Sequence, residues 1–321
     1  MLALIGVGSL AASFDVFSQQ PGKVWRIGFL STRSGPDTFL EAFHEQLRVL
    51  GYVEGRNLVF VYRWAPGKEH RLPELAAELA QLKVDVILAA STEPAVAAKR
   101  ATSTIPIVMA TASDPVSTGL VASLARPGGN VTGNTMLSTE LAGKRLQLVR
   151  ELIPKVTRIG LLAFAGESYA TAPFIEEIRA AAQQMGITLV VQRAKEAGEL
   201  VGAFSAMRQE RAQAVFVQVT PFTVEHRTRI VELAVQHRLP ALFNVRNFVE
   251  VGGLISYGPS LNELWRNAAR YVDRIFKGAR PADLPVEQPT KFEMVINLKT
   301  AKVLGIKLPQ SVLARADEVI Q

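Results

Sequence analysis

The sequence predicts an α/β protein built from two doubly wound parallel-sheet lobes that are joined by three crossovers. From Val24 onward, short aliphatic or β-branched runs alternate with longer amphipathic segments, as in βαβ units. The alternation is interrupted by a cluster of Gly and Pro near residue 130 and then starts afresh. The length of 321 residues also exceeds what a single hydrophobic core usually supports.

The first block of the sequence contains four strand–helix units. Strands are expected at 25–30, 57–62, 85–89 and 105–110, and helices at 37–50, 71–82, 93–102 and 116–124. The first helix carries an apolar stripe at helical spacing, formed by Phe39, Phe43, Leu47 and Leu50. Gly51 follows it, as a helix-ending glycine should. The cluster Arg126-Pro127-Gly128-Gly129-Asn130 then precedes an extended run, 131–136, where we place the first crossing.

The second block repeats the same period. Strands are expected at 158–164, 188–192, 214–218 and 241–244, and helices at 139–152, 172–185, 200–208 and 223–237. A glycine-bracketed strand at 252–258 suits a second crossing, and the long helix 261–276 would return to the first lobe. The Pro-rich connector 281–289, a strand at 292–297 and helices at 300–304 and 309–320 close the chain. We therefore expect lobe 1 at 24–132 plus 258–288, and lobe 2 at 133–257 plus 289–321.

The N-terminus predicts export. Residues 2–12 are apolar but too few to cross a hydrocarbon core of about 30 Å, so no stable membrane insertion is expected. Val16-Phe17-Ser18 follows at the spacing of a cleavage site, so residues 1–18 are interpreted as a signal peptide, although it lacks the usual initial Lys or Arg. The sequence has no Cys, and therefore no disulfide and no lipid-anchored Cys. These features favour a freely soluble periplasmic protein.

Several function classes find no support in the sequence. The net charge of +7 is spread along helices with no basic run longer than two, which argues against nucleic acid as a partner. Ile5-Gly6-Val7-Gly8-Ser9 resembles part of a dinucleotide fingerprint, but no strand precedes it. No phosphate loop, nucleophile elbow or paired-His metal motif is present. The four His residues fall on predicted helices or at their starts, which argues against a metal site. We expect no metal, no cofactor and no catalytic residue.

Polar residues follow the strands of the first lobe. Since the carboxyl ends of parallel strands form the binding crevice of such sheets, these loops are candidate ligand contacts. They supply hydroxyl and carboxylate groups, from Ser31, Thr32, Ser91, Thr92, Glu93, Ser113 and Asp114. The alternative is helix capping, because Ser, Thr and Asp are the preferred N-cap residues. Three such loops at one sheet edge favour a polar pocket wall.

The second lobe supplies candidate contacts at corresponding strand ends. They are Glu167, Ser168, Tyr169, Thr220, Phe222, Asn244 and Arg246. Tyr169 and Phe222 would stack on an aromatic or aliphatic ligand. Arg246 would pair with a carboxylate, with a solvated or hinge-bracing role as the alternative, and Asp114 or Glu93 would hold an ammonium group. The hypothesis is that a small amino acid or carboxylate binds between the lobes.

Several separated segments also resemble one protein family. They are residues 21–30 (Pro21-Gly22-Lys23-Val24-Trp25-Arg26-Ile27-Gly28-Phe29-Leu30), 113–116 (Ser113-Asp114-Pro115-Val116), 124–133 (Leu124-Ala125-Arg126-Pro127-Gly128-Gly129-Asn130-Val131-Thr132-Gly133), 248–250, 252–260 and 297–301. The sequence is similar in these segments to ABC transporter substrate-binding proteins of the tryptophan/tyrosine type. The resemblance runs from about residue 21 to the end of the chain.

The resemblance implies a type I periplasmic-binding-protein fold with three crossovers and no catalytic activity. It also implies an importer permease and ATPase as partners, and we expect a monomer. Two loops depart from the family pattern, Ala165-Gly166-Glu167 and Phe243-Asn244-Val245-Arg246. Both lie at the expected pocket, so the family's aromatic amino acids are not transferred as the ligand. The alternatives are a doubly wound enzyme and a ligand sensor of the same fold, although no helix-turn-helix segment precedes residue 25.

Overall fold

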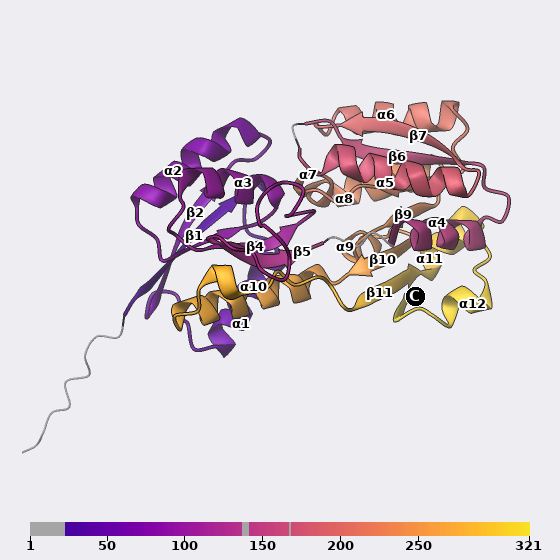
Figure 1. Ribbon diagram of the computed structural model, residues 1–321. Coiled ribbons are helices and arrows are strands. Elements are labelled where there is room, and N and C mark those ends of the chain that lie inside the picture. Colours follow the sequence, from indigo (N-terminus) through magenta and orange to yellow (C-terminus); the bar gives the residue numbers. More distant parts are fainter. Residues whose placement is uncertain (1–22, 137–140, 167) are drawn as a thin grey trace, which may run out of the picture.

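The computed structural model describes residues 23–136, 141–166 and 168–321. The expected signal peptide at 1–18 and the candidate contact Glu167 therefore lie outside the described residues. Two sheets with helices on both faces form two lobes, which lie side by side in Figure 1.

Lobe 1 is built on a five-stranded parallel sheet. Its strands are β1 (Trp25–Ser31), β2 (Leu58–Trp64), β3 (Val86–Ala89), β4 (Ile107–Ala112) and β5 (Val131–Thr135). They are ordered β2-β1-β3-β4-β5. Every residue of β3 and β4 is buried, as expected for central strands covered on both faces.

Four helices cover this sheet, two on each face. They are α1 (Thr38–Val49), α2 (Leu72–Gln81), α3 (Thr92–Ala101) and α10 (Leu261–Phe276), with the short helix η1 (Glu69–Arg71) before α2. Helices α1 and α10 contact each other on one face, and α2 and α3 contact each other on the other (Figure 1). Helix α10 thus returns to lobe 1, as the sequence predicted.

Lobe 2 is built on a seven-stranded sheet that is parallel except for one pair. Its strands are β6 (Arg158–Phe164), β7 (Thr188–Ala194), β8 (Ala214–Val217), β9 (Ala241–Phe243), β10 (Ile255–Pro259), β11 (Phe292–Asn297) and β12 (Glu318–Ile320). The order β7-β6-β8-β9-β10 repeats the arrangement of lobe 1, and β11 and β12 extend it. Only β10 and β11 pair antiparallel, because β11 enters this sheet from the opposite end.

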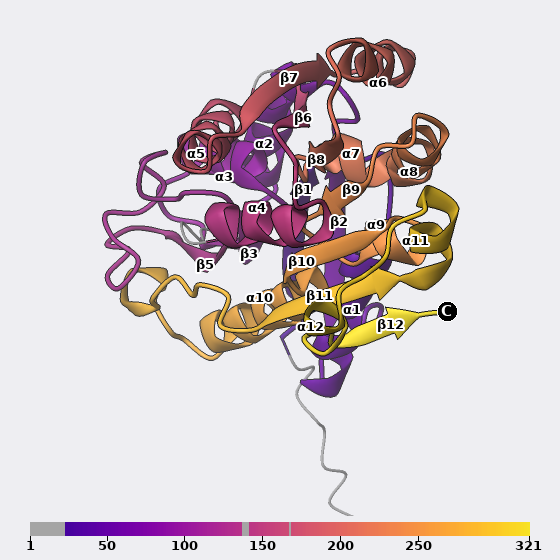
Figure 2. The same cartoon turned by 90° about the vertical axis from the view of Figure 1, so that its right-hand side faces the viewer.

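The helices of lobe 2 also lie on both faces of its sheet (Figure 2). They are α4 (Leu141–Leu152), α5 (Thr171–Gln184), α6 (Glu199–Gln209), α7 (Pro221–Glu225), α8 (Arg227–Gln236), α9 (Asn247–Glu250), α11 (Leu298–Leu304) and α12 (Gln310–Leu313). A core on the side of α4 and α5 is separate from the core on the side of α6 and α8.

The chain passes between the sheets three times. It leaves the first sheet after β5, returns to lobe 1 between β10 and α10, and leaves again before β11, after η2 (Pro281–Asp283). The first crossing therefore follows Thr135 rather than residue 132, and all of β10 up to Pro259 belongs to the second sheet. The hinge connections are held together by the bond from the Thr135 backbone N–H to the carbonyl of Glu287.

Three expected helices differ from the structure. Residues 116–124 form turns, because Gly119 takes a left-handed φ of +69° and Lys99 binds the carbonyl of Leu120. The expected helix at 223–237 is two helices that meet at His226. The expected helix at 309–320 is only one turn, α12, and is followed by β12. The edge of β11 offers that final segment backbone partners that a terminal helix would lack.

Candidate ligand-binding cleft

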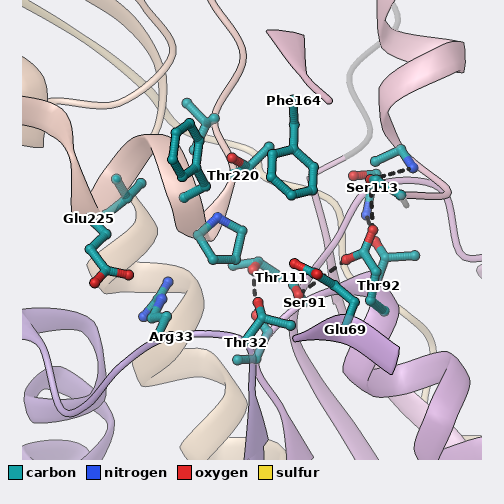
Figure 3. A pocket seen from close by; sticks show the side chains of 18 of the residues that line it. Thr32, Arg33, Glu69, Ser91, Thr92, Thr111, Ser113, Phe164, Thr220 and Glu225 are labelled. Atoms are coloured by element: carbon teal, nitrogen blue, oxygen red, sulfur yellow. Dashed lines mark hydrogen bonds between the residues drawn. The ribbon is translucent and has the colours of Figure 1, made fainter. Parts of the chain in front are cut away.

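A cavity of about 240 Å³ lies between the lobes, where the carboxyl ends of both sheets face each other. We call it the main cavity. Lobe 1 contributes loop residues that follow β1, β2, β3 and β4, and lobe 2 contributes loop residues that follow β6, β7 and β8. Figure 3 shows the hydroxyl-bearing residues of lobe 1 facing Phe164 and Thr220 of lobe 2. The sheet topology therefore brings loops from both sheets to one site.

The lobe 1 wall is made of ordered hydroxyl groups. Thr111 donates from Oγ1 to the carbonyl of Ala90 at 2.8 Å, and Thr92 accepts at Oγ1 from the backbone N–H of Ser113 at 3.0 Å. These bonds tie the ends of β3 and β4 together. Ser91 stands at the N-cap position of α3 but caps no backbone N–H, and its Oγ lies 3.4 Å from Glu93. The hydroxyl of Ser91 therefore does not cap the helix, although helix capping was the alternative to ligand binding for this residue.

The lobe 2 wall is aromatic. The rings of Phe164, the last residue of β6, and Phe222 lie 5.8 Å apart between centroids. Phe222 also meets His226 edge-on at 4.8 Å. Thr220 caps α7 through the backbone N–H of Thr223, so here capping and cavity lining are combined in one residue. This wall presents a rigid apolar surface suited to an aromatic or branched aliphatic group.

Charged side chains of both signs surround the main cavity. Arg33 and Lys195 line it together with Glu69, Glu93 and Glu225. Arg33 forms an ion pair with Asp37 and lies over the rings of Phe39 and Trp265. Burial lowers the pKa of Arg33, while the charges of Asp37 and Glu225 act in the opposite direction. The buried Nε of Arg33 has no hydrogen-bond partner among the described residues.

Among the described residues, three side-chain hydrogen bonds span the cleft. Ser168 donates from Oγ to Glu93 at 2.7 Å, and Ser34 donates to Glu225 at 2.9 Å. Arg100 donates to the hydroxyl of Tyr169 at 3.2 Å. In each pair one residue belongs to lobe 1 and the other to lobe 2. The structure therefore shows the two lobes in contact with each other beside the main cavity.

A second cavity, of about 150 Å³, adjoins the first towards the hinge. We call it the side cavity. Four residues line both cavities, namely Ser113, Met136, Ala170 and Val219. The side cavity is bounded by the turn at Asp114, the loop at Tyr169, the end of β9 at Asn244, and helices α4 and α5.

The candidate contacts from the sequence divide between these cavities. The main cavity is lined by Thr32, Ser91, Thr92, Glu93, Ser113, Ser168, Thr220 and Phe222. The side cavity is lined by Asp114, Tyr169 and Asn244, again with Ser113. Ser31 is fully buried within β1, and its Oγ accepts from the backbone N–H of Arg33. It therefore supports the loop rather than lining either cavity.

The expected role of Arg246 needs correction. Its guanidinium binds Glu250 at 2.7 Å, Glu318 at 2.7 Å and Glu293 at 3.4 Å, so it joins α9 to β11 and β12. Hydrogen bonding to Glu250 is the largest cause of the raised pKa of Arg246. Arg246 lines neither cavity. The bracing alternative describes it better, because three carboxylates already satisfy this cation.

Sequence reasoning missed several lining residues. Arg33 belongs to the candidate loop after β1, and Phe164 is the last residue of a predicted strand. Their positions at strand ends were therefore the one sequence signal that could have identified them as lining residues. Glu69 and Lys195 follow the edge strands β2 and β7, whose loops were not considered. Arg145 and Glu177 of the side cavity lie on helices and follow no strand. No sequence signal separated them from ordinary solvated helix charges.

No helix among the described residues is long and apolar enough to span a membrane. No group of three or more His, Cys, Asp or Glu side chains among them is placed to hold a metal ion.

Comparison with known proteins places the chain in a family. The sequence pattern of the family described as ABC transporter substrate binding protein matches residues 29–320. A tyrosine-binding protein of Clostridioides difficile (strain R20291) is 28% identical over 272 residues, which covers 84% of this chain and 77% of that protein.

Solved structures agree with this placement. A conserved domain protein from Vibrio cholerae O1 biovar El Tor is 30% identical with a TM-score of 0.85, covering 92% of this chain and 100% of that one. The ABC domain in complex with L-Trp from Streptococcus pneumonia is 28% identical with a TM-score of 0.84, covering 92% and 99%. The two-lobed arrangement of the chain is thus that of these two solved structures.

Proposed function

The chain belongs to the ABC transporter substrate-binding protein family, and from that premise we propose that it is the periplasmic receptor of an ABC importer. Its two lobes close on an amino acid or on an aromatic or aliphatic carboxylate. The receptor then presents the closed form, as a monomer, to a membrane permease with its ATPase. It performs no chemistry on its ligand, since binding alone shifts the population of the closed form.

One observation carries the proposal: a cavity of about 240 Å³ that both lobes line, with cross-lobe hydrogen bonds at its rim. A ligand in this space contacts both lobes at once, and such contacts stabilise the closed form over the open one. Phe164 and Phe222 favour an aromatic or branched group, while the hydroxyl and charged groups opposite them favour a polar head. The names of the relatives that bind L-Trp or tyrosine support the same class of ligand.

A thermal-shift screen tests the proposal. The panel holds the twenty amino acids, aromatic and branched carboxylic acids, sugars and polyamines. A ligand at about 100 times its dissociation constant adds about 2.7 kcal/mol to the free energy of unfolding, which raises the melting temperature by several degrees. We expect amino acids or carboxylic acids with an aromatic or branched group to give this rise. A rise with sugars or polyamines alone would refute the ligand class.

Two controls sharpen the screen. Phe222→Ala removes one ring of the main cavity and should weaken binding of every active compound, because each uses the apolar wall. Val303→Ala removes a side chain of similar apolar type that is 64% exposed on α11, far from the cavity lining, and should change no affinity. Native mass spectrometry of the purified protein would in addition identify any ligand that it carries.

A further inference from the structure

The amino-terminal edge of the lobe 2 sheet lies at the opposite end of the strands from the cleft. Both cavities lie at the carboxyl ends, so this edge faces away from lobe 1; in Figure 2, lobe 2 lies in front of lobe 1 and the edge is turned towards the viewer. The neighbouring strands β6, β8 and β9 are parallel, so all three begin at this edge. The residues that precede them therefore share one surface, with the strands about 4.8 Å apart.

Five exposed cations lie on this surface. One residue stands three positions before each of β6, β8 and β9, a fourth is the first residue of β6, and the fifth belongs to the last turn of α6. They are Lys155, Arg158, Arg208, Arg211 and Arg238, which we call the basic edge. The segments that carry them, 152–158, 205–213 and 235–240, contain one carboxylate, that of Glu210. The basic edge is therefore strongly positive.

Hydrogen bonds hold the segments of the basic edge side by side. The side-chain oxygen of Gln213, before β8, accepts from the backbone N–H of Arg158 at 3.1 Å. The guanidinium of Arg158 donates in turn to the backbone carbonyl of Glu210 at 3.5 Å. Val215 of β8 donates from its N–H to the carbonyl of Pro240, before β9, at 2.9 Å. The sheet thus fixes the backbone positions from which these cations project.

The charges of the basic edge are not neutralised within the protein. None of the five cations forms an ion pair with an Asp or Glu that the structure describes. Glu210 accepts at Oε1 from the side-chain amide of Gln192 at 3.0 Å. On the same helix that precedes Arg238, by contrast, Arg229 pairs with Glu232 at 3.3 Å. Like charges on one surface repel each other, so an unpaired group of this size favours an anionic partner.

Two of these cations occupy backbone positions that favour glycine. Arg211 and Arg238 follow α6 and α8 with φ of +60° and +51°. Helix α5, in the same lobe, is followed instead by Gly186, with φ of +66°. A side chain is strained in this left-handed region, whereas glycine is not. Attraction to the helix carbonyls offsets part of that strain, but the strain also points to a use for the charge that glycine could not serve.

The chemistry of the basic edge favours a phospholipid surface over other polyanions. Its three segments contain no Phe, Trp or Tyr, so they offer no ring for stacking on nucleic acid bases and no aromatic anchor for a protein interface. They offer charges on long, flexible side chains. A plane of anionic headgroups attracts Lys and Arg in this way, over a range that is set by salt.

We propose that the basic edge binds the anionic headgroups of a phospholipid membrane, reversibly and without insertion. This role goes beyond the receptor function and does not depend on which ligand the cleft takes. Binding at the amino-terminal edge leaves the cleft free, because the cavities lie at the carboxyl ends of the strands. It keeps a receptor without a Cys for lipid attachment close to the membrane that holds its permease.

Vesicle co-sedimentation tests this role. Wild type is mixed with vesicles of phosphatidylglycerol and phosphatidylcholine in equal parts, or of phosphatidylcholine alone. We expect binding to the first kind only, because the second carries no net charge; binding through the apolar residues 2–12 would occur with both. Raising the ionic strength from about 0.1 M to about 1 M shortens the Debye length from about 10 Å to about 3 Å and should abolish binding.

Glycine substitutions remove two charges without straining the backbone. Arg211→Gly/Arg238→Gly should lower the vesicle partition coefficient about 10- to 30-fold and keep the melting temperature and ligand affinity of wild type. Arg211→Lys/Arg238→Lys keeps both charges and should bind within about threefold of wild type. The matched control is Lys83→Gly, the same kind of change at φ +50° after α2 in lobe 1, which should bind within about twofold of wild type.

Other results would overturn the proposal. Equal binding to both kinds of vesicle, or no binding by wild type, would show that the basic edge recognises no lipid charge. Unchanged binding of the glycine double variant would limit Arg211 and Arg238 to a role at the helix ends. An equal loss per charge in Lys83→Gly would assign binding to the net charge of the protein.

A duplex oligonucleotide provides the last comparison. If it binds more tightly than the anionic vesicles at the same salt, with the same dependence on Arg211 and Arg238, the partner is nucleic acid and the proposal fails. The thermal-shift screen for the cleft ligand uses no vesicles, so the membrane role and the receptor function are refuted by separate measurements.

Discussion

Arg246 shows how one cation organises a corner of lobe 2. It binds carboxylates from α9, β11 and β12, of which Glu293 is the least exposed partner, at 22% of its side chain. Burial raises the pKa of Glu293, and the charge of Arg246 opposes that effect. Without Arg246, the carboxylate of Glu293 would be left partly buried beside two other carboxylates. The side chain therefore matters for stability rather than for ligand binding.

The variant Arg246→Ala should accordingly lower the free energy of unfolding by about 1–2 kcal/mol and leave ligand affinity unchanged. Urea unfolding measures the first quantity and calorimetry the second. The matched control is Arg229→Ala, which loses one exposed pair with Glu232 at 3.3 Å and should stay within about 0.5 kcal/mol of wild type. A large loss of ligand affinity with unchanged stability would instead show that Arg246 contributes to ligand binding.

Among elements, the regular βαβ units were predictable and the irregular segments were not. Buried strands such as β3 and β4 are short continuous apolar runs, and α1 carries its apolar stripe and the Asp37 cap within its own sequence. Local sequence signals predict the wrong structure where contacts with distant parts of the chain determine the conformation of a segment. Asp114 and Pro115 look like a helix start, but Lys99 and Gly119 hold the segment in turns. The strand β12 exists only because β11 offers an edge.

The same reasoning explains which site residues were predictable. The topology of parallel sheets sends strand ends to one edge, so strand-end loops marked most of the main cavity. Arg145 was not predicted as a lining residue, because its position on a helix does not indicate that α4 buries this basic side chain. Arg246 was placed in the site on the same rule of strand ends, but its side chain turns towards β12, whose existence the sequence did not reveal.

At the level of one strand, Gly258 of β10 should tolerate no side chain. Gly258→Ala places a Cβ 1.9 Å from the carbonyl oxygen of Asn244. This oxygen is a backbone atom, so relieving the clash requires the main chain to shift. We expect the free energy of unfolding to fall by at least about 2 kcal/mol in urea titrations. The control Gly202→Ala lies in α6 with nothing within 4 Å of its Cβ, and should stabilise the helix by up to about 1 kcal/mol. Equal effects of the two substitutions would contradict the close approach.

For the whole molecule, closure depends on contacts that exist only while the lobes meet. Ser34 binds Glu225 and Arg100 binds Tyr169 across the cleft, and neither Ser34 nor Arg100 lines the main or the side cavity. Their loss should therefore destabilise the closed form without removing a ligand contact. Because a ligand binds most tightly to the closed form, its apparent affinity falls when that form becomes less favourable.

The double variant Ser34→Ala/Arg100→Ala should bind the ligand found in the thermal-shift screen about 3- to 10-fold more weakly, mainly through faster dissociation, as surface plasmon resonance would show. The melting temperature of the ligand-free protein should not change, because an open form makes neither bond. The control Arg48→Ala/Ser123→Ala removes side-chain bonds within lobe 1, to His44 and Arg126, and should keep wild-type affinity. Small-angle scattering of the ligand-free double variant should give a radius of gyration at least as large as that of wild type. An unchanged affinity would mean that these two rim contacts contribute nothing to closure, and that the ligand alone holds the lobes together.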